Sequence, residues 1–191
     1  ANNYEIIVVD NGSGKESQDF LDDLVEGGEV KVVRNQKNEY WSKAANQGAQ
    51  AANKNSKYLI FMHCDVVVIN PAWMDLLVNA AESQHSGMIG VDTTSYDVGG
   101  NKHPFIQEYC VLFTKACWES CGPWSEELPM VGGSFIMTDA ASKKGFSPQY
   151  LKDNKLVHHY RIFSLDINEW EKIVEKAQIA IPKVMRNTIA I

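Results

Sequence analysis

The first half of the chain carries two kinds of apolar pattern in turn, one typical of strands and one typical of helices. Short continuous runs rich in Val, Ile and Leu occupy residues 4–10, 30–33 and 58–62. A continuous apolar run is typical of a strand buried on both faces, as in a parallel sheet. Helical patterns follow these runs over residues 17–25, 43–53 and 71–80. This order of strands and helices predicts a three-layer α/β domain with a mostly parallel central sheet.

The second half of the chain has weaker patterns. Further strands are predicted at residues 88–91 and 108–114, helices at 134–144 and 168–176, and short β-type runs at 178–181 and 188–191. We expect Ser134 to cap the helix that it begins and Gly145 to end that helix. The stretch between the last two predicted core strands, 93–102, is polar and contains glycine, which indicates a loop.

Composition narrows the classes of protein that fit. A chain of 191 residues with 45% apolar and 22% charged residues is an ordinary globular domain, which excludes a disordered chain or a coiled coil. The formal charge of −6 argues against a nucleic-acid partner, because duplex binding needs a basic face. No stretch reaches the roughly 20 apolar residues of a membrane span, and the first residues do not resemble a signal peptide. We therefore expect a cytoplasmic protein without a transmembrane segment.

The cysteines form no CxxC pair. Free, mostly buried thiols in a reducing compartment are the expected state, with a zinc site as the alternative. The four residues are Cys64, Cys110, Cys117 and Cys121.

Two carboxylates stand where strands are predicted to end, which is the edge of an α/β sheet that binds ligands. Asp10 closes the first strand and also fits an Asx-turn before the Asn-Gly pair that follows it. Asp65 lies between two apolar runs, where an ionised group is expensive to bury without a partner. A divalent cation would be such a partner, since hard cations prefer oxygen ligands.

Five short motifs follow one another between residues 4 and 160. They are YEIIVVDNGS (4–13), RN with a later N, W and AANQG (34–48), KYLIFMHCD (57–65), CGPWSEE (121–127) and VHH (157–159). Their order resembles that of the inverting family 2 glycosyltransferases. In that family the third of these segments delivers the metal-binding carboxylates, and the last supplies a histidine.

The resemblance implies a GT-A fold that binds a nucleotide sugar over residues 1–160, with the helix and strand of residues 161–191 in the same domain. It implies a UDP-sugar donor, a glycan, lipid-linked or protein hydroxyl group as acceptor, and Mn²⁺ or Mg²⁺ as cofactor. The cation would neutralise the leaving diphosphate. The residues implied to bind the substrate are Asp10, Asn11, Arg34, Asn46 and Trp124.

The metal ligands implied by the resemblance are Asp65, His63 and His158. Consecutive residues of an extended segment point to opposite sides, so only one of His158 and His159 can be a ligand. His63 stands where the family usually carries a carboxylate or Asn. A His ligand would favour Mn²⁺ over Mg²⁺, and a hydrogen-bonded His63 without metal is the alternative.

An inverting transfer also needs a general base to deprotonate the acceptor hydroxyl. The family places a carboxylate at the start of a helix that aligns with residues 133–134, where this sequence has Gly and Ser. Asp139 and Glu127 are therefore the candidates for the base, and we expect slow or no turnover. Two alternatives stay open: a carbohydrate- or nucleotide-binding module on a degenerate scaffold, and a nucleotidyltransferase.

The sequence starts at what would be the second strand of that family, without the usual first strand and helix. Residues 178–187, an apolar run followed by Ile-Pro and Arg-Asn, resemble the absent segment. They are expected to fill its place, within the same chain or in a swapped homodimer. An ordinary C-terminal strand or tail is the alternative.

Overall fold

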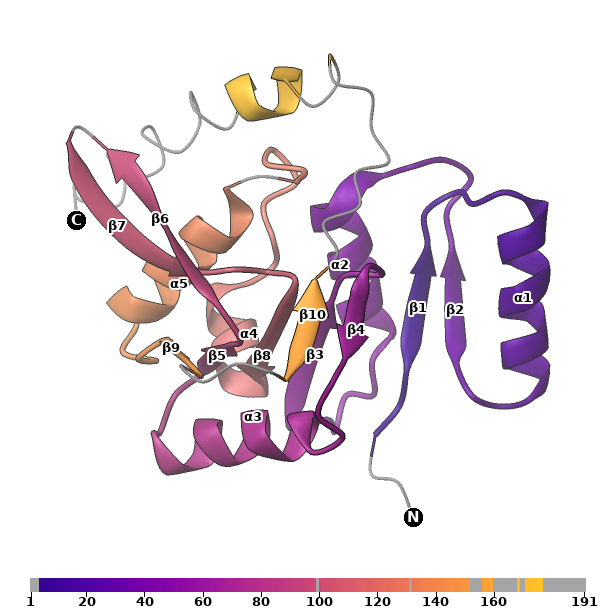
Figure 1. The fold of residues 1–191 in the computed structure, drawn as a ribbon, viewed down its shortest axis with the longest axis horizontal. Helices are drawn as coiled ribbons and strands as arrows, with labels where there is room; N and C mark the ends of the chain where they lie inside the picture. Colours follow the sequence, from indigo (N-terminus) through magenta and orange to yellow (C-terminus); the bar gives the residue numbers. More distant parts are fainter. Residues whose placement is uncertain are drawn as a thin grey trace.

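The computed structural model describes residues 4–98, 100–130, 132–151, 156–159, 168 and 171–176 (Figure 1). The strands are β1 (Ile7–Asp10), β2 (Lys31–Arg34), β3 (Tyr58–Met62), β4 (Val66–Val68), β5 (Met88–Gly90), β6 (Thr93–Val98), β7 (Asn101–Ile106), β8 (Cys110–Thr114), β9 (Gln149–Tyr150) and β10 (Val157–His159). The helices are α1 (Lys15–Glu26), α2 (Tyr40–Ala51), α3 (Trp73–Ser83), α4 (Lys115–Cys121) and α5 (Gly133–Lys143). Residues 168 and 171–176 are helical as well. No helix in this described part is both long enough and apolar enough to span a bilayer.

At one end of the molecule, β1 and β2 form a parallel pair flanked by α1 (right of Figure 1). The register places Asp10 opposite Arg34 at the carboxyl ends of the two strands. α1 ends before a pair of glycines, Gly27 and Gly28, and Gly28 adopts the left-handed φ of 71° that closes the turn. No residue of α1 is buried, and Phe20 is 62% exposed. Core packing therefore holds this helix less firmly than it holds α2 or α3.

The central sheet has the strand order β3-β8-β5-β9. β8 is antiparallel to both of its neighbours, whereas β5 and β9 are parallel. The sheet is thus mixed, with β8 as the reversed strand. The first four residues of β8 are buried, as expected for a strand with a neighbour on each side and a helix on each face.

Helices cover both faces of this sheet. On one face, Phe61 and Phe113 pack with Trp124 and with apolar side chains of α2, α4 and α5. On the other face, Ile89 and Leu112 pack against α3. Successive side chains of each strand therefore pack alternately into two separate hydrophobic cores, one on each face of the sheet. The result is the three-layer α/β architecture that the apolar pattern predicted.

Two local expectations were wrong. The stretch predicted as a loop is the hairpin of β6 and β7, in which Val98 pairs with Asn101 across a two-residue connection. Gly100 there has a φ of 85°, and its N–H bonds to Asp97 Oδ1, so the glycine that indicated a loop forms a hairpin turn instead. The expected cap of α5 is also absent: the N-cap is Gly132, with a φ of 90°, and no side chain caps the helix.

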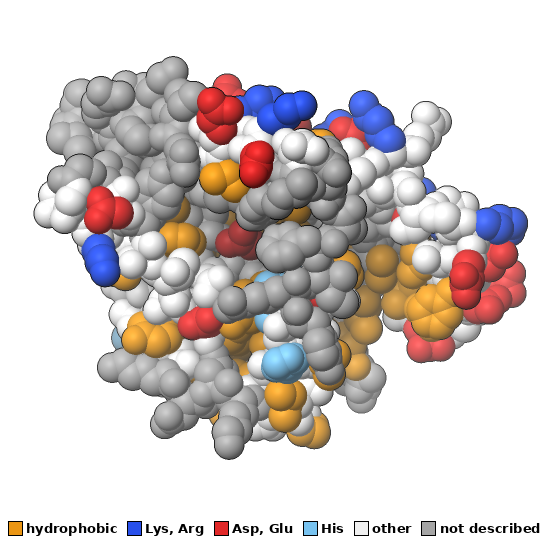
Figure 2. Space-filling view, turned by 45° about the horizontal axis from the view of Figure 1, so that its top comes forward, with side chains coloured by type: hydrophobic (Ala, Val, Ile, Leu, Met, Phe, Trp, Pro, Cys, Tyr) orange, Lys and Arg blue, Asp and Glu red, His pale blue; other side chains and the backbone are white. Residues whose placement is uncertain are grey.

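Within the described residues, no strand ladder joins β1 to β3. β1 pairs with β2, and β3 pairs with β8. α2 packs on both sheets, because its Gly48 lies against Val9 of β1 and its Ala45 belongs to the core beneath β3. Hydrophobic side chains are visible in the recess between the part that carries α1 and the rest of the molecule (Figure 2). Residues 178–187, which we expected to fill a strand position here, lie outside the described residues.

Candidate metal and nucleotide site

A tight turn after β3 presents two of the predicted metal ligands. The N–H of His63 donates to the carbonyl of Tyr109 at 3.0 Å, and the N–H of Val66 donates back to the carbonyl of His63 at 3.3 Å. This turn places His63 and Asp65 side by side, with 4.0 Å between His63 Nδ1 and Asp65 Oδ1. Both side chains thus sit at the carboxyl end of β3, the edge where α/β sheets bind ligands.

The third member of the cluster is His159. β10 pairs antiparallel with β4 so that His159 stands opposite Val66, the residue after Asp65. His159 Nε2 consequently lies 3.2 Å from Asp65 Oδ2. The structure therefore places His159 in the cluster, whereas His158, which we had assigned as a ligand, is exposed. One ligand atom from each of His63, Asp65 and His159 lies within 4.8 Å of the others.

Aromatic rings enclose the two imidazoles. The ring centroids of Trp41 and His63 are 4.2 Å apart, and Tyr109 stacks on His159 with 4.4 Å between their ring centroids. Burial lowers the pKa of His63 to about 4, and the neighbouring His159 adds to this, whereas Asp65 opposes it. His63 is therefore neutral at neutral pH, and a neutral imidazole is the form that binds metals.

The donor set fits a divalent cation. Two imidazole nitrogens and a carboxylate suit Mn²⁺ better than Mg²⁺, which prefers oxygen ligands alone. Each histidine also has a buried nitrogen, His63 Nε2 and His159 Nδ1, with no hydrogen-bond partner among the described residues. The nitrogens that face the Asp65 carboxylate are the other pair, His63 Nδ1 and His159 Nε2, and these are the atoms in place to bind a cation. All four cysteines are free, and none belongs to the group of His63, Asp65 and His159. The alternative of a zinc site made of cysteines is therefore without support.

The residues predicted to bind the nucleotide at β1 and β2 form a connected network. Asp10 accepts hydrogen bonds from the Ser13 N–H at 2.9 Å and from Arg34 at 3.2 Å. Burial alone would raise the pKa of Asp10, but the hydrogen bonds from Ser13 and the charge of Arg34 outweigh it and hold the pKa below its usual value. Asn11 Oδ1 accepts a hydrogen bond from the side-chain amide of Asn35 at 2.9 Å. These contacts organise the carboxyl ends of the two strands; that the same residues contact a nucleotide stays a prediction.

Asn46 and Trp124 have a structural connection that the sequence did not reveal. The Asn46 amide group donates to the Trp124 carbonyl and accepts from its N–H, both at 2.9 Å. Both side chains are buried, and Trp124 is 1% exposed. The Trp124 ring therefore packs in the core, and no open face is left on which a sugar could stack.

The carboxylates that we considered as general bases lie apart from the first turn of α5. Asp139 is five residues beyond Ser134 and pairs with Lys143 at 2.8 Å. Glu127 is exposed. A different carboxylate, which sequence reasoning missed, contacts this turn: Ser134 Oγ donates to Glu108 Oε2. Burial raises the pKa of Glu108, and the hydrogen bond from Ser134 only partly opposes this.

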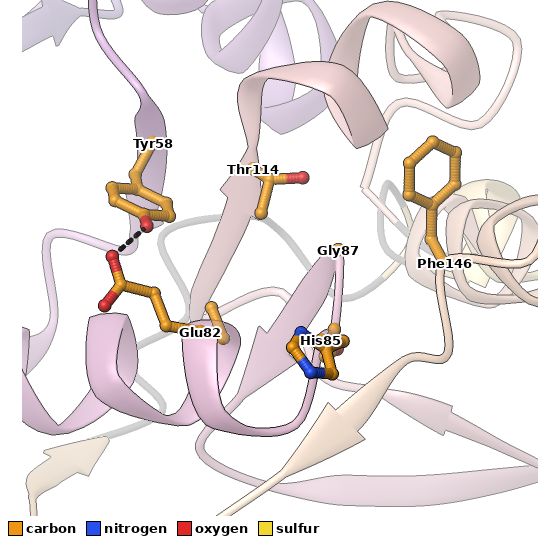
Figure 3. Close-up of a pocket in the computed structure, with 8 residues that line it drawn as sticks. Tyr58, Glu82, His85, Gly87, Thr114 and Phe146 are labelled. Atoms are coloured by element: carbon orange, nitrogen blue, oxygen red, sulfur yellow. Dashed lines mark hydrogen bonds between the residues drawn. The ribbon is translucent and has the colours of Figure 1, made fainter.

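A separate pocket opens at the opposite end of the sheet (Figure 3). Its rim includes Tyr58, the first residue of β3, and Thr114, the last residue of β8. The Tyr58 hydroxyl donates to Glu82 at 2.8 Å across this rim. Because His63 follows the other end of β3, this pocket is distinct from the His63–Asp65–His159 cluster.

Solved glycosyltransferases share this fold. A mannosyltransferase from Pyrobaculum calidifontis, solved with GDP-Man and Mn²⁺, matches with a TM-score of 0.67 at 15% identity, over 95% of this chain and 55% of its own. GalNAc-T7, solved with UDP, GalNAc and Mn²⁺, matches with a TM-score of 0.64 at 17% identity, over 77% of this chain and 36% of its own. TarS 1-349 from S. aureus, solved with UDP, gives 0.60 at 13% identity, over 92% and 55%. The chain thus spans between about a third and just over half of these proteins, and its fold is the GT-A fold.

The sequence profile of glycosyl transferase family 2 matches residues 1–146. The chain therefore belongs to glycosyl transferase family 2. No curated protein sequence matches it.

Proposed function

We propose that the chain is the donor-binding part of a metal-dependent glycosyltransferase that uses a UDP-sugar. His63, Asp65 and His159 would hold Mn²⁺, or Mg²⁺ with lower preference. Asp10, Asn11 and Arg34, at the carboxyl ends of β1 and β2, would contact the nucleoside. A glycan or another hydroxyl compound would be the acceptor.

The observation that carries this proposal is the His63–Asp65–His159 cluster at the carboxyl end of β3. Two side chains from the turn after β3 and one from β10, far along the sequence, converge there, with 3.2 Å between His159 Nε2 and Asp65 Oδ2. A bound divalent cation would supply charge neutralisation to the leaving diphosphate. Asp65 would bind the cation through its negatively charged carboxylate, and neutral His63 would bind it through the lone pair of a ring nitrogen. The Trp41 and Tyr109 rings would limit the access of water to both imidazoles.

A thermal-shift screen of UDP-, GDP- and dTDP-sugars, each with and without Mn²⁺, tests the proposal. We expect a rise in Tm that needs both a UDP-sugar and Mn²⁺, because ligands that bind the folded state stabilise it. Stabilisation by a sugar alone, independent of nucleotide and metal, would contradict the proposal.

A second candidate is a binding module without turnover on the same scaffold. It is favoured by one observation: the first turn of α5 contains no acidic residue. Such a module would bind the nucleotide sugar with metal but would release no nucleotide. Measuring nucleotide release in the conditions that give the thermal shift separates the two.

A further inference from the structure

A group that accepts a proton is needed beside the metal cluster if the bound donor is to react with a hydroxyl group by direct displacement. An alcohol is a weak nucleophile, and a positioned base contributes roughly 10²- to 10⁴-fold to its reaction. Asp65 would be occupied by metal, Asp139 is paired with Lys143, and Glu127 is exposed. Glu108 is a further carboxylate of this region, and its side chain contacts the first turn of α5 directly.

Glu108 is held between the metal cluster and α5. Its neighbour Tyr109 stacks on His159 and accepts the hydrogen bond from the His63 N–H, which fixes this short connection before β8 against the cluster. On its other side, the Glu108 carboxylate accepts the hydrogen bond from Ser134 in the first turn of α5. Backbone and side chain thus hold Glu108 from two directions.

The first turn of α5 belongs to the same site. A Cβ on Gly133 would lie 3.3 Å from the Trp124 ring, so the start of α5 approaches this ring closely. Trp124 in turn contacts Trp41, which lies against His63. Ser134 therefore stands at the far end of a continuous set of contacts that begins at the metal cluster, and Glu108 reaches it from the cluster side.

We infer that Glu108 is the general base of the transfer reaction, brought from the connection between β7 and β8 to the helix start that itself lacks a carboxylate. The inference rests on the proposed function. In the step, the acceptor oxygen forms a bond to the anomeric carbon of the donor. The bond from that carbon to the diphosphate oxygen breaks, and its electron pair leaves with the nucleoside diphosphate. The hydroxyl proton passes to Glu108.

The surroundings of Glu108 suit this role. Ser134 Oγ donates to one carboxylate oxygen, Oε2, and Glu108 as a whole residue is half-buried rather than sealed in the core. Among the described residues, no Lys or Arg forms an ion pair with Glu108, which would lower its pKa and weaken it as a base. Its raised pKa is in the direction that makes a carboxylate a stronger proton acceptor.

The experiment compares the wild type with Glu108→Gln, which keeps the size of the side chain and an oxygen that can accept from Ser134. Binding of the UDP-sugars of the thermal-shift screen is measured by calorimetry with Mn²⁺. Release of UDP is measured with water as the acceptor. Glu119→Gln, on the exposed surface of α4, is the matched control.

We expect Glu108→Gln to bind the donor within about twofold of wild type and to release UDP at least roughly 100-fold more slowly. Glu119→Gln should match wild type in both measurements. Glu108→Asp, which keeps the carboxylate, should fall between wild type and Glu108→Gln and provides a test if the Gln variant does not fold.

Other outcomes overturn the inference in distinguishable ways. Normal UDP release by Glu108→Gln, with loss in Asp139→Asn or Glu127→Gln, would move the base to one of those residues and leave the proposed function intact. Loss of donor binding in Glu108→Gln would make it a residue that holds the donor. Donor binding without UDP release in the wild type would support the binding module, and no donor binding at all would contradict the proposed function itself.

Discussion

His159 Nε2 lies 3.2 Å from Asp65 Oδ2 because the antiparallel register of β10 on β4 sets His159 opposite Val66. The candidate metal site therefore depends on the pairing of two short strands that are distant in sequence. A shift of this register by one residue would replace His159 with His158, since alternate residues of a strand face opposite sides.

The two histidines can be distinguished by mutation. His159→Ala should weaken Mn²⁺ binding by at least the roughly 10- to 100-fold that even outer partners of metal ligands contribute. His158→Ala, at the exposed neighbouring position, should leave Mn²⁺ affinity unchanged. Titration of each variant with Mn²⁺, followed by electron paramagnetic resonance of the free ion, measures both. Loss of affinity in His158→Ala alone would restore our original assignment.

Asp10 should make a pH-dependent contribution to stability. Its pKa is below the usual 3.8 in the folded protein, so the stabilisation is present above that value and is lost as the pH falls through the folded-state pKa. Asp10→Asn should lower the free energy of unfolding by about 1–3 kcal/mol at pH 7, and this difference from wild type should shrink below about pH 4.

Urea unfolding at pH 7 and pH 3 measures this difference. Asp19→Asn is the matched control, because the ion pair of Asp19 with Lys15 is exposed and should contribute less than about 1 kcal/mol. A difference for Asp10→Asn that does not change with pH would show that the carboxylate charge is not its source.

Asn46 should stabilise the folded protein even when no ligand is bound. Asn46→Ala leaves the N–H and the carbonyl of buried Trp124 without their partner, at about 1–3 kcal/mol for each group. We therefore expect a clear drop in Tm in the absence of any ligand. Gln50→Ala, at an exposed position of the same helix, should change the Tm little. A normal Tm combined with lost nucleotide binding would return Asn46 to the ligand pocket.

The expected role of residues 178–187 in filling a strand position beside β1 stays a prediction. If it holds, deletion of residues 178–191 should abolish the cooperative unfolding transition, because the apolar face and the strand edges would lose their partner. A deletion variant that unfolds cooperatively at the wild-type temperature would identify these residues as a dispensable tail.

Most elements from β1 to α3 could be predicted from apolar patterns of their own, and β3 agrees with its predicted range to the residue. The short strand β4 was not predicted, and α1 buries none of its residues although its apolar residues recur at helical spacing. The β6–β7 hairpin could not, since its polar residues give no alternation and its glycines are equally typical of a loop. Asp65 could be identified from its position between apolar runs. His159 and Glu108 could not be assigned, because one depends on a strand register and the other on a contact between a loop and a helix.

In the proposed function, Asp65 holds a divalent cation through which the donor diphosphate binds. Calorimetric titration of UDP with and without Mn²⁺, on wild type and Asp65→Asn, tests it most directly, with Asp75→Asn on the exposed side of α3 as the control. We expect Mn²⁺ to strengthen UDP binding to wild type and to Asp75→Asn, and we expect Asp65→Asn to lose this effect while it keeps the wild-type circular dichroism spectrum. An undiminished effect of Mn²⁺ in Asp65→Asn would contradict it.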